Sequence, residues 1–316
     1  MSDVKKTATR DAYGQALCEL GKEMDNFYVL DADLAGATKT CMFKKAFPER
    51  HIDCGIAEQN MMSIAAGLAA CGNVVFASSF AMFAAGRAFE QVRNSICYPK
   101  LNVKIGATHA GISVGEDGAS HQCCEDIALM RSLPNMTIIN PADETEAKLA
   151  VKAAAKFNGP CYLRFGRLAV PVVFDENYKF EIGKGVVLEE GTDVTIIATG
   201  LMVDSAIKAC ELLKNEGISA RIVNMATIKP LDTELVLESA AKTGAIVTAE
   251  EHSIIGGLGG AVAETICENG AGVPVVRVGV EDAFGMSGPA LQLLDHYKLN
   301  AAGIVEKAKK AISLKR

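Results

Sequence analysis

The chain has 316 residues, of which 49% are apolar and 22% charged, and its net charge is -6. This composition is typical of a globular protein long enough for two domains, each with its own hydrophobic core. An acidic chain without a block of Lys and Arg is not expected to bind nucleic acid or an anionic membrane, so an acidic metabolite would need local Arg and His residues.

The ten cysteines form no C-x-x-C pair, and most lie in apolar sequence, as free thiols do in a reducing compartment. We therefore expect a cytoplasmic protein, and the first residues lack the apolar core of a secretory signal. The adjacent Cys123 and Cys124 are expected to pack in the structure, with a redox pair or metal ligands as the alternatives.

Short β-branched or aromatic runs alternate with helical patterns in the first half of the chain. The patterns predict strands at 27–32, 73–78, 102–107, 136–141 and 161–166. They predict helices near 10–24, 57–71, 81–97, 122–132 and 143–157. This alternation is typical of parallel strands with helices on both faces of the sheet, and we place this first domain at 1–170.

No charged side chain occurs between Gln59 and Gly86. The stretch is long enough to cross a membrane, but Gly72 and Asn73 interrupt it and a β-rich run follows. We interpret it as helix, turn, buried strand and helix, so no membrane partner is expected.

Residues 171–191 lose the alternation and gain proline, glycine and charge, which predicts a linker. A second α/β series follows, with predicted strands at 193–200, 219–226, 244–251 and 274–280 and helices near 203–216, 258–269 and 301–313. We expect a smaller parallel-sheet domain at 192–316. The fold class is therefore α/β, with two doubly wound domains.

The glycine-rich run "IIGGLGGAV" at 254–262 follows a strand and opens a helix, as dinucleotide-binding motifs do. Val262 stands where that motif has its third glycine, so we interpret the glycines as close packing of loop against helix. The preceding Glu250, Glu251 and His252 are expected either at a domain or subunit boundary or at a solvated strand end.

The segment "THAGISVGEDGASHQ" at 108–122 follows a predicted strand at its carboxyl end, where open α/β sheets bind ligands. Two histidines and two acids on a glycine-rich loop favour a functional role over packing. No H-E-x-x-H or C-x-x-C spacing occurs in the chain, so a zinc ion held by the protein is not expected.

Arg164 and Arg167 end the last strand of the first domain in "YLRFGR". A guanidinium group there could hold a phosphate through paired hydrogen bonds, with simple solvation as the alternative. Arg10 and His109 could converge on the same opening of the site. Three cationic side chains there predict a phosphorylated small molecule as the ligand.

Glu58 is the acid that opens the uncharged stretch, in the first turn of a predicted helix. The helix dipole favours its ionised form by about 0.3–1 kcal/mol. Burial favours the neutral form more strongly. We expect a buried carboxyl group that shares a proton near neutral pH, as a general acid must; the alternative is a capping glutamate exposed on one side.

Four motifs in order, "IDCGIAEQN", "SSFAMF", "THAGISVGEDGASHQ" and "YLRFGR", resemble the carboxyl-terminal half of transketolase. The sequence from "TDVTIIATG" onward resembles the third domain of that family, so the resemblance covers nearly the whole chain. It implies a pyrimidine-binding domain and a transketolase C-terminal domain. It also implies that Glu58 hydrogen-bonds the aminopyrimidine ring of thiamine diphosphate in a dry pocket, promoting the tautomer that removes the thiazolium proton.

The same resemblance assigns further cofactor contacts. Phe83 would stack on the pyrimidine ring with Phe80 nearby, although both read as core residues from the sequence alone. Leu34 would hold the cofactor in its bent shape, and Asp33 would lie beside it.

Substrate contacts are implied in the same way. Arg10, His109 and Arg167 match positions that hold the sugar phosphate. Asp117 and His121 match groups that contact the sugar hydroxyls and carbonyl during carbon–carbon cleavage, which with Glu58 completes the implied catalytic set.

Three departures from the family pattern stand out. Ala37 occupies the position of a phosphate-binding serine, for which Thr38 could substitute, and Gly86 stands where many relatives have an aromatic ring. The G-D-G motif of the family's amino-terminal domain does not occur. The resemblance therefore implies a split enzyme, in which a separate N-terminal subunit holds the diphosphate and Mg²⁺ (or Ca²⁺) in an α2β2 assembly.

These matches predict the C-terminal subunit of a transketolase of the pentose phosphate pathway, which passes a two-carbon ketol unit from a ketose phosphate to an aldose phosphate. The nearest alternatives are a deoxyxylulose phosphate synthase and the β subunit of a 2-oxo-acid dehydrogenase; His109 and Arg167 favour sugar phosphates over free oxo acids. An alternative of another class is a catalytically silent binding or regulatory subunit, which the presence of Glu58, Asp117 and His121 disfavours.

Overall fold

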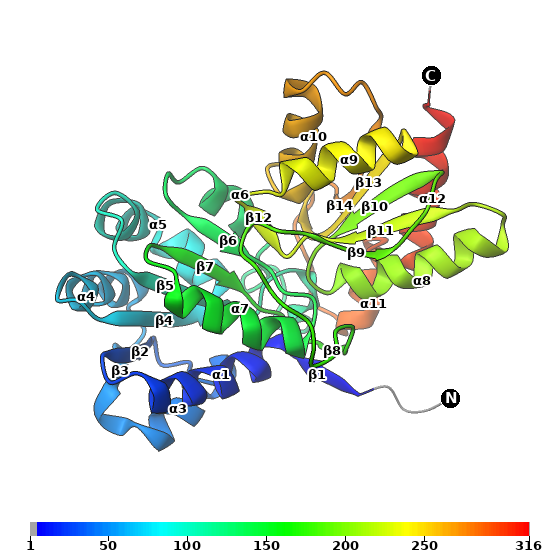
Figure 1. Ribbon diagram of the computed structural model, residues 1–316. Helices are drawn as coiled ribbons and strands as arrows, with labels where there is room; N and C mark the ends of the chain where they lie inside the picture. Colours follow the sequence, from blue (N-terminus) through cyan, green and yellow to red (C-terminus); the bar gives the residue numbers. More distant parts are fainter. Residues whose placement is uncertain (1–4, 316) are drawn as a thin grey trace.

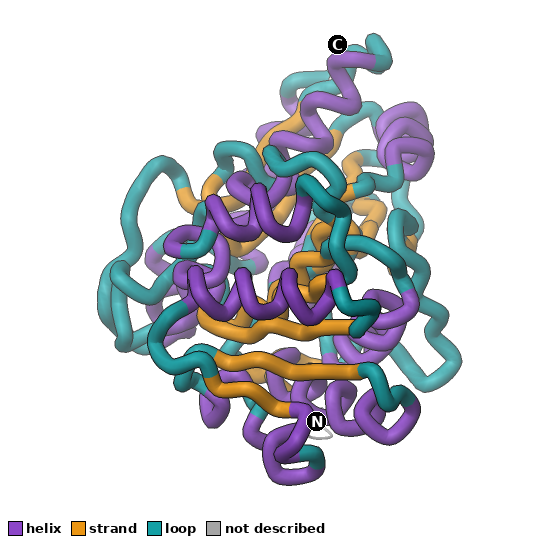
Figure 2. Tube along the Cα trace, turned by 90° about the vertical axis from the view of Figure 1, so that its left-hand side faces the viewer, coloured by secondary structure: helices purple, strands orange, loops and turns teal. Residues whose placement is uncertain are grey.

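The computed structural model describes residues 5–315, so residues 1–4 and 316, the outer ends of the two predicted domains, lie outside it. Two sheets lie side by side, each covered by helices (Figure 1). Figure 2 shows strands lying next to one another with helices above and below them. The prediction of an α/β fold with two mainly parallel sheets is confirmed.

The first sheet has seven strands in the order β12-β6-β7-β5-β4-β2-β3. Their bounds are β2 (Phe27–Asp31), β3 (His51–Asp53), β4 (Val74–Phe80), β5 (Val103–Thr108), β6 (Thr137–Ile139), β7 (Cys161–Arg164) and β12 (Thr227–Lys229). Six of them run parallel, and only β12 pairs antiparallel, with β6. Every residue of β4 is buried, as expected of a central strand covered on both faces.

Two helical layers cover this sheet. One consists of α1 (Thr9–Glu23), α3 (Cys41–Ala46) and α7 (Glu144–Lys156), and the other of α4 (Glu58–Ala70), the helical segment 82–97 and α6 (Asp126–Arg131). The segment 81–97 was predicted as one helix. It contains α5 (Phe89–Gln91) between two π-helical turns, Met82–Arg87 and Val92–Cys97, a geometry that is frequent at functional sites.

The second sheet has the order β14-β13-β10-β11-β9. Its strands are β9 (Val186–Glu189), β10 (Val194–Ala198), β11 (Ala220–Asn224), β13 (Ile246–Ser253) and β14 (Val275–Val280). One face packs on α8 (Met202–Asn215) and α12 (Ala301–Ser313), and the other on α9 (Thr233–Thr243) and α10 (Leu258–Glu268). The remaining elements include β1 (Lys6–Ala8), which pairs with β8 (Ala169–Pro171), α2 (Ala35–Thr38) and α11 (Ala290–His296).

Two strands depart from the predicted division of the chain into two domains and a linker. The strand β12 follows β11 of the second sheet in the chain but extends the first sheet. The strand β9 lies within 171–191, the segment predicted as a linker, and pairs antiparallel with β11. The limits 1–170 and 192–316 stay predictions.

A buried carboxylate also joins the domains. Glu146 on α7 accepts hydrogen bonds from the Tyr178 hydroxyl and the Asn224 amide, each at 2.7 Å, and from the Ala142 backbone amide at 2.7 Å. Burial raises the pKa of Glu146 to about 7, against these donors.

The position of Glu146 predicts a dependence of stability on pH. Because its folded pKa of about 7 lies above its usual value of 4.5, its contribution to stability is fully present below pH 4.5 and is lost as pH rises through 7. Glutamine mimics the neutral acid at every pH. Relative to Glu146→Gln, the wild type should therefore lose about 2–3 kcal/mol of unfolding free energy between pH 5 and pH 8, measured by urea denaturation. Parallel pH curves for the two proteins would contradict this assignment.

Candidate active site

The candidate site lies at the carboxyl ends of β2, β4, β5 and β7. The sheet order reverses between β2 and β4, because β3 lies on one side of β2 and the later strands lie on the other. Such a switch point opens a crevice outside the strand ends, which is where open α/β sheets bind ligands. The predicted site loops leave from these ends.

Glu58 is the first residue of α4, and only 1% of its surface is exposed. The Ser79 hydroxyl donates to one carboxylate oxygen at 3.2 Å, and Arg87 Nη1 donates to the other at 2.7 Å. The predicted burial is confirmed, and the alternative of a half-exposed capping glutamate is wrong.

Arg87, the partner of Glu58, was not among the predicted site residues. The guanidinium carbon lies 4.6 Å from the centre of the Phe83 ring, and the side chain is 47% exposed. The guanidinium group therefore lies over the Phe83 ring while it donates to Glu58. One signal was available, because Glu58 and Arg87 are the two charged residues that bound the uncharged stretch.

Aromatic rings continue inward from Phe83. The Phe80 ring lies 5.9 Å from the Phe83 ring and 3.9 Å from the His109 imidazole, on which it stacks. The edge of His121 meets Phe83 at 5.4 Å. The structure thus brings four of the predicted site residues, from two strands and their loops, into one cluster.

His109 lies beside Arg10, and both residues were predicted to contact the substrate phosphate. Arg10 Nη1 donates to His109 Nε2 at 3.0 Å, so the ring proton is on Nδ1, which donates to the Thr108 hydroxyl at 2.9 Å. Burial, together with the charges of Arg10 and Arg167, lowers the pKa of His109 to about 3. His109 is therefore neutral at physiological pH.

Arg10 and Arg167 are the two arginines predicted to contact the phosphate, and they define the arginine end of the site. Arg10 also donates to the backbone oxygen of Ala37 at 3.1 Å. Arg167 donates to the Val114 backbone oxygen and, at 3.1 Å, to the exposed Glu116. Burial lowers the pKa of Arg10, and the charge of Arg167 adds to this effect while that of Asp11 opposes it. Two such cations can hold one dianion.

The other predicted residues vary in access. Asp117 is exposed, and His121 is partly exposed, with its Nδ1 2.9 Å from the Ser120 hydroxyl. Leu34 is partly exposed, and Asp33 is exposed with a left-handed backbone (φ 59°).

Thr38 does not face the arginine end. Its side chain is fully buried, and its hydroxyl donates to Asp31 at 2.7 Å, which also accepts from Thr40 at 2.8 Å and from the Leu34 amide at 2.5 Å. Asp31 thus holds the turn after β2. Thr38 would have to leave Asp31 before it could replace a phosphate-binding serine.

Arg164 was predicted either to bind a phosphate or to be solvated, and the prediction of phosphate binding is wrong. Its side chain is 3% exposed, and its Nε donates to the buried Asp126 at 2.8 Å. Although burial acts in the opposite direction, Arg164 holds the pKa of Asp126 below its usual value. Arg164 is therefore part of a buried ion pair, and a strand-end arginine gives no sequence signal for that.

Cys123 and Cys124 are buried beside this pair. Burial raises the pKa of both thiols far above neutral pH, which keeps them protonated and unreactive. Within residues 5–315, no group of three His, Cys, Asp or Glu side chains is arranged to bind a metal ion. None of the helices described there is long and apolar enough to span a bilayer.

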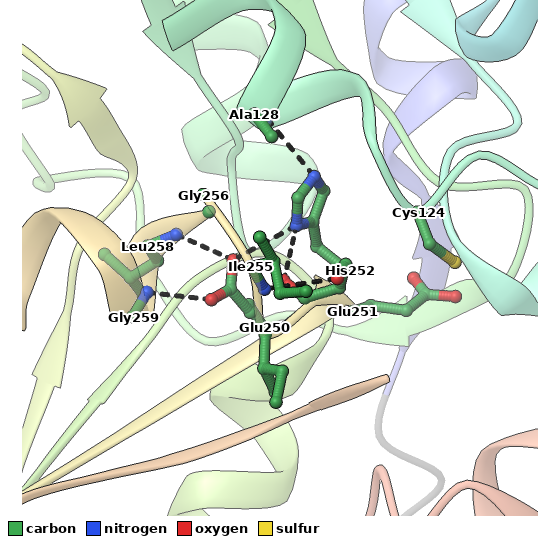
Figure 3. Close-up of polar contacts among 12 residues, drawn as sticks. Cys124, Ala128, Glu250, Glu251, His252, Ile255, Gly256, Leu258 and Gly259 are labelled. Atoms are coloured by element: carbon green, nitrogen blue, oxygen red, sulfur yellow. Dashed lines mark hydrogen bonds and ion pairs between the residues drawn. The ribbon is translucent and has the colours of Figure 1, made fainter. Parts of the chain in front are cut away.

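The close-packing reading of the glycine-rich run is confirmed. A Cβ atom on Gly257 would lie 2.0 Å from the Glu250 carboxylate, and one on Gly259 would lie 2.8 Å from the Thr248 hydroxyl. Glu250, Glu251 and His252 are all buried, and His252 reaches the backbone of Ala128 in the first domain (Figure 3). Glu251 and His252 lie at the domain boundary, whereas Glu250 binds the start of α10 within the second domain, and the solvated alternative is wrong.

Together these features define a two-domain α/β protein in which a buried acid, aromatic rings and an arginine end lie near the carboxyl ends of strands of the first sheet. Comparisons with known proteins agree. The profile described as "Transketolase, pyrimidine binding domain" matches residues 5–172, and "Transketolase, C-terminal domain" matches residues 183–304. The chain belongs to the transketolase family, and the resemblance noted from its motifs is confirmed.

Relatives cover nearly the full length of the chain. A protein of Methanocaldococcus jannaschii, named as a transketolase C-terminal section, is 55% identical over 94% of each chain. The 6-deoxy-6-sulfo-D-fructose transketolase subunit SqwH of Clostridium sp. is 44% identical over 95% of this chain and 92% of its own. A solved structure described as "Split gene transketolase, inactive beta4 tetramer" has a TM-score of 0.91 and 56% identity, covering 99% of this chain and 100% of that one.

Proposed function

We propose that this chain is the C-terminal subunit of a thiamine-diphosphate-dependent transketolase that transfers a two-carbon ketol unit from a ketose phosphate to an aldose phosphate. The observation that carries the proposal is the arrangement of Glu58, Phe83 and Arg87. The planar Arg87 guanidinium lies over the Phe83 ring and donates to Glu58. An aminopyrimidine ring would make the same two contacts, so the residues present fit the cofactor.

When bound, thiamine diphosphate supplies the carbon nucleophile for ketol transfer. Glu58 then holds and shares a proton with a nitrogen of the ring, and its burial excludes competing water. Phe83 would contact the ring, supported by Phe80, and Leu34 and Asp33 would also contact the cofactor. Arg87 has to swing aside, which its half-exposed position allows.

The arginine end orients the substrate in this proposal. Arg10 and Arg167 bind the phosphate group, with His109 as a neutral hydrogen-bonding partner. His121 and Asp117 lie on the loop between the two ends, where they contact the sugar hydroxyls and carbonyl. The relative that acts on a sulfonated sugar suggests that the anionic group differs among relatives, and we assign a phosphate here.

A separate N-terminal subunit completes the site in an α2β2 assembly, and it holds the diphosphate and Mg²⁺ or Ca²⁺. The exposed face of α4 carries uncharged residues, among them Gln59, Asn60 and Ser63, and Ile56 beside it is 76% exposed. A surface poor in charge with an exposed large apolar residue is typical of a protein interface. The ten free cysteines support a reducing, cytoplasmic location.

The test is to mix the chain with the N-terminal subunit, thiamine diphosphate and Mg²⁺, and to assay transfer from xylulose 5-phosphate to ribose 5-phosphate. We expect transfer by the mixture and none by either chain alone. In Arg10→Ala the KM for the phosphorylated donor should rise about 10- to 100-fold, because a hydrogen bond to a charged group is lost. The KM for an unphosphorylated donor should stay unchanged.

Consumption of pyruvate without ketol transfer would contradict the proposal and favour a deoxyxylulose phosphate synthase or a 2-oxo-acid dehydrogenase. Absence of any turnover in the fully assembled mixture would favour a silent regulatory subunit.

A further inference from the structure

The second domain contacts the substrate loop of the first domain at several points. The substrate loop, residues 109–125, joins β5 to α6. The segment of the second domain that makes these contacts, residues 250–256, consists of the end of β13 and the turn that follows it. Three of its contacts go to the far end of the loop and to α6, the helix after the loop. Ser253 N donates to the Cys124 oxygen at 2.7 Å, Ala128 N donates to His252 Nε2 at 3.3 Å, and Arg131 donates to the Gly256 oxygen at 2.7 Å.

The fourth contact reaches the middle of the loop. The Ser113 backbone amide donates to a carboxylate oxygen of Glu251 at 2.5 Å, and Glu251 is 3% exposed. Ser113 belongs to a 3-10 turn, Ile112–Val114, that lies between His109 and Asp117 in the chain.

The loop also packs directly on this carboxylate. Gly111 has a left-handed backbone (φ 81°), and a Cβ atom there would lie 2.3 Å from the Glu251 carboxyl carbon. Only glycine therefore lets the loop approach so closely. The Arg164 guanidinium donates to the Glu251 backbone oxygen at 2.9 Å, and it is itself held by Asp126. These contacts fix Glu251 from the side of the first domain.

We propose that Glu251 is the positioning residue of the substrate loop, through which the second domain sets the places of His109 and Asp117 for the transfer reaction. The inference rests on the proposed function for its catalytic consequence. It gives the second domain a defined task, since the predicted site residues all lie in the first domain.

The neighbouring residue offers a matched control. Glu250 is also buried, at 1% exposure, and accepts from two backbone amides, Leu258 N at 2.7 Å and Gly259 N at 2.8 Å. Both of these amides belong to α10 in the second domain. Figure 3 shows the two carboxylates pointing to opposite sides of the strand, Glu250 toward Leu258 and Gly259 and Glu251 away from them. Glu250 therefore shares the burial of Glu251 without its contact to the loop.

The first test is hydrogen exchange of the full chain, alone and assembled with its partner. In Glu251→Ala the backbone amides of 111–118 should exchange about tenfold faster or more, because the Ser113 amide loses its acceptor. Glu251→Gln keeps an acceptor oxygen and should restore most of the protection. Glu250→Ala and Glu250→Gln should leave exchange of 111–118 unchanged. Unchanged exchange in Glu251→Ala, or equal acceleration by Glu250→Ala, would overturn the proposal.

The second test is a KM and kcat comparison in the assembled enzyme. Glu251→Ala should raise the KM for the phosphorylated donor about tenfold, with rescue by Glu251→Gln. A uniform loss of active protein with unchanged KM would show a merely structural role and would overturn the proposal. If the wild type transfers no ketol unit, the proposed function fails, and the exchange experiment still decides whether Glu251 positions the loop.

Discussion

Glu58→Gln is expected to lower the kcat of the assembled enzyme by about 10²–10⁴-fold, the contribution typical of a positioned proton-transfer group. Glutamine keeps the size of the side chain and can still accept from the Ser79 hydroxyl, but it cannot share a proton with the cofactor ring. Glu58→Ala should have the same effect with loss of the hydrogen bond as well. Steady-state ketol transfer measures both variants.

The fold should survive these changes. Glu58 pairs with Arg87, whose side chain is 47% exposed and can turn to solvent when its partner is removed. A matched control is Glu90→Gln, because Glu90 is an exposed carboxylate on the same helical segment that contacts only its neighbours Gln91 and Asn94. We expect wild-type activity for this control. A Glu58 variant that retains a tenth of wild-type activity or more would contradict the role of Glu58.

The alternation of short strands and helices was enough to predict most strands of the two sheets and most of the helices that cover them, because parallel strands buried on both faces leave near-continuous apolar runs. Helix α9 and the three-residue strand β3 were not predicted. The same reasoning missed β12 and β9. Both are short and pair antiparallel at a sheet edge with partners distant in the chain, so no local pattern marks them.

The position of the site followed from the polar loops after predicted strands, but the partners of its charged residues did not. Arg164 and Arg167 are three residues apart at one strand end, yet Arg164 is buried on Asp126 while Arg167 reaches the loop. Which arginine turns inward depends on a carboxylate from α6. The same limit applies to Arg87 and Glu251, whose contacts arise only when distant segments pack together.

The largest expected effect of all is the dependence on a second chain. The exposed Ile56 directly precedes Glu58 and the uncharged face of α4 in the chain, which suits a cofactor held between two polypeptides. Ile56→Lys should therefore prevent assembly and remove all activity, because a charge would be buried without a partner. Leu212→Lys is the matched control, since Leu212 is 46% exposed on α8 in the second domain. Analytical ultracentrifugation measures the assembly of both variants, and an Ile56→Lys chain that assembles normally would count against this interface.

Calorimetric titration of thiamine diphosphate with Mg²⁺ reports most directly on whether this chain provides the pyrimidine half of a shared site. The chain mixed with its N-terminal subunit should show saturable heat with one cofactor per chain, whereas each chain alone should show none. Saturable binding of the same affinity to this chain alone would contradict the account.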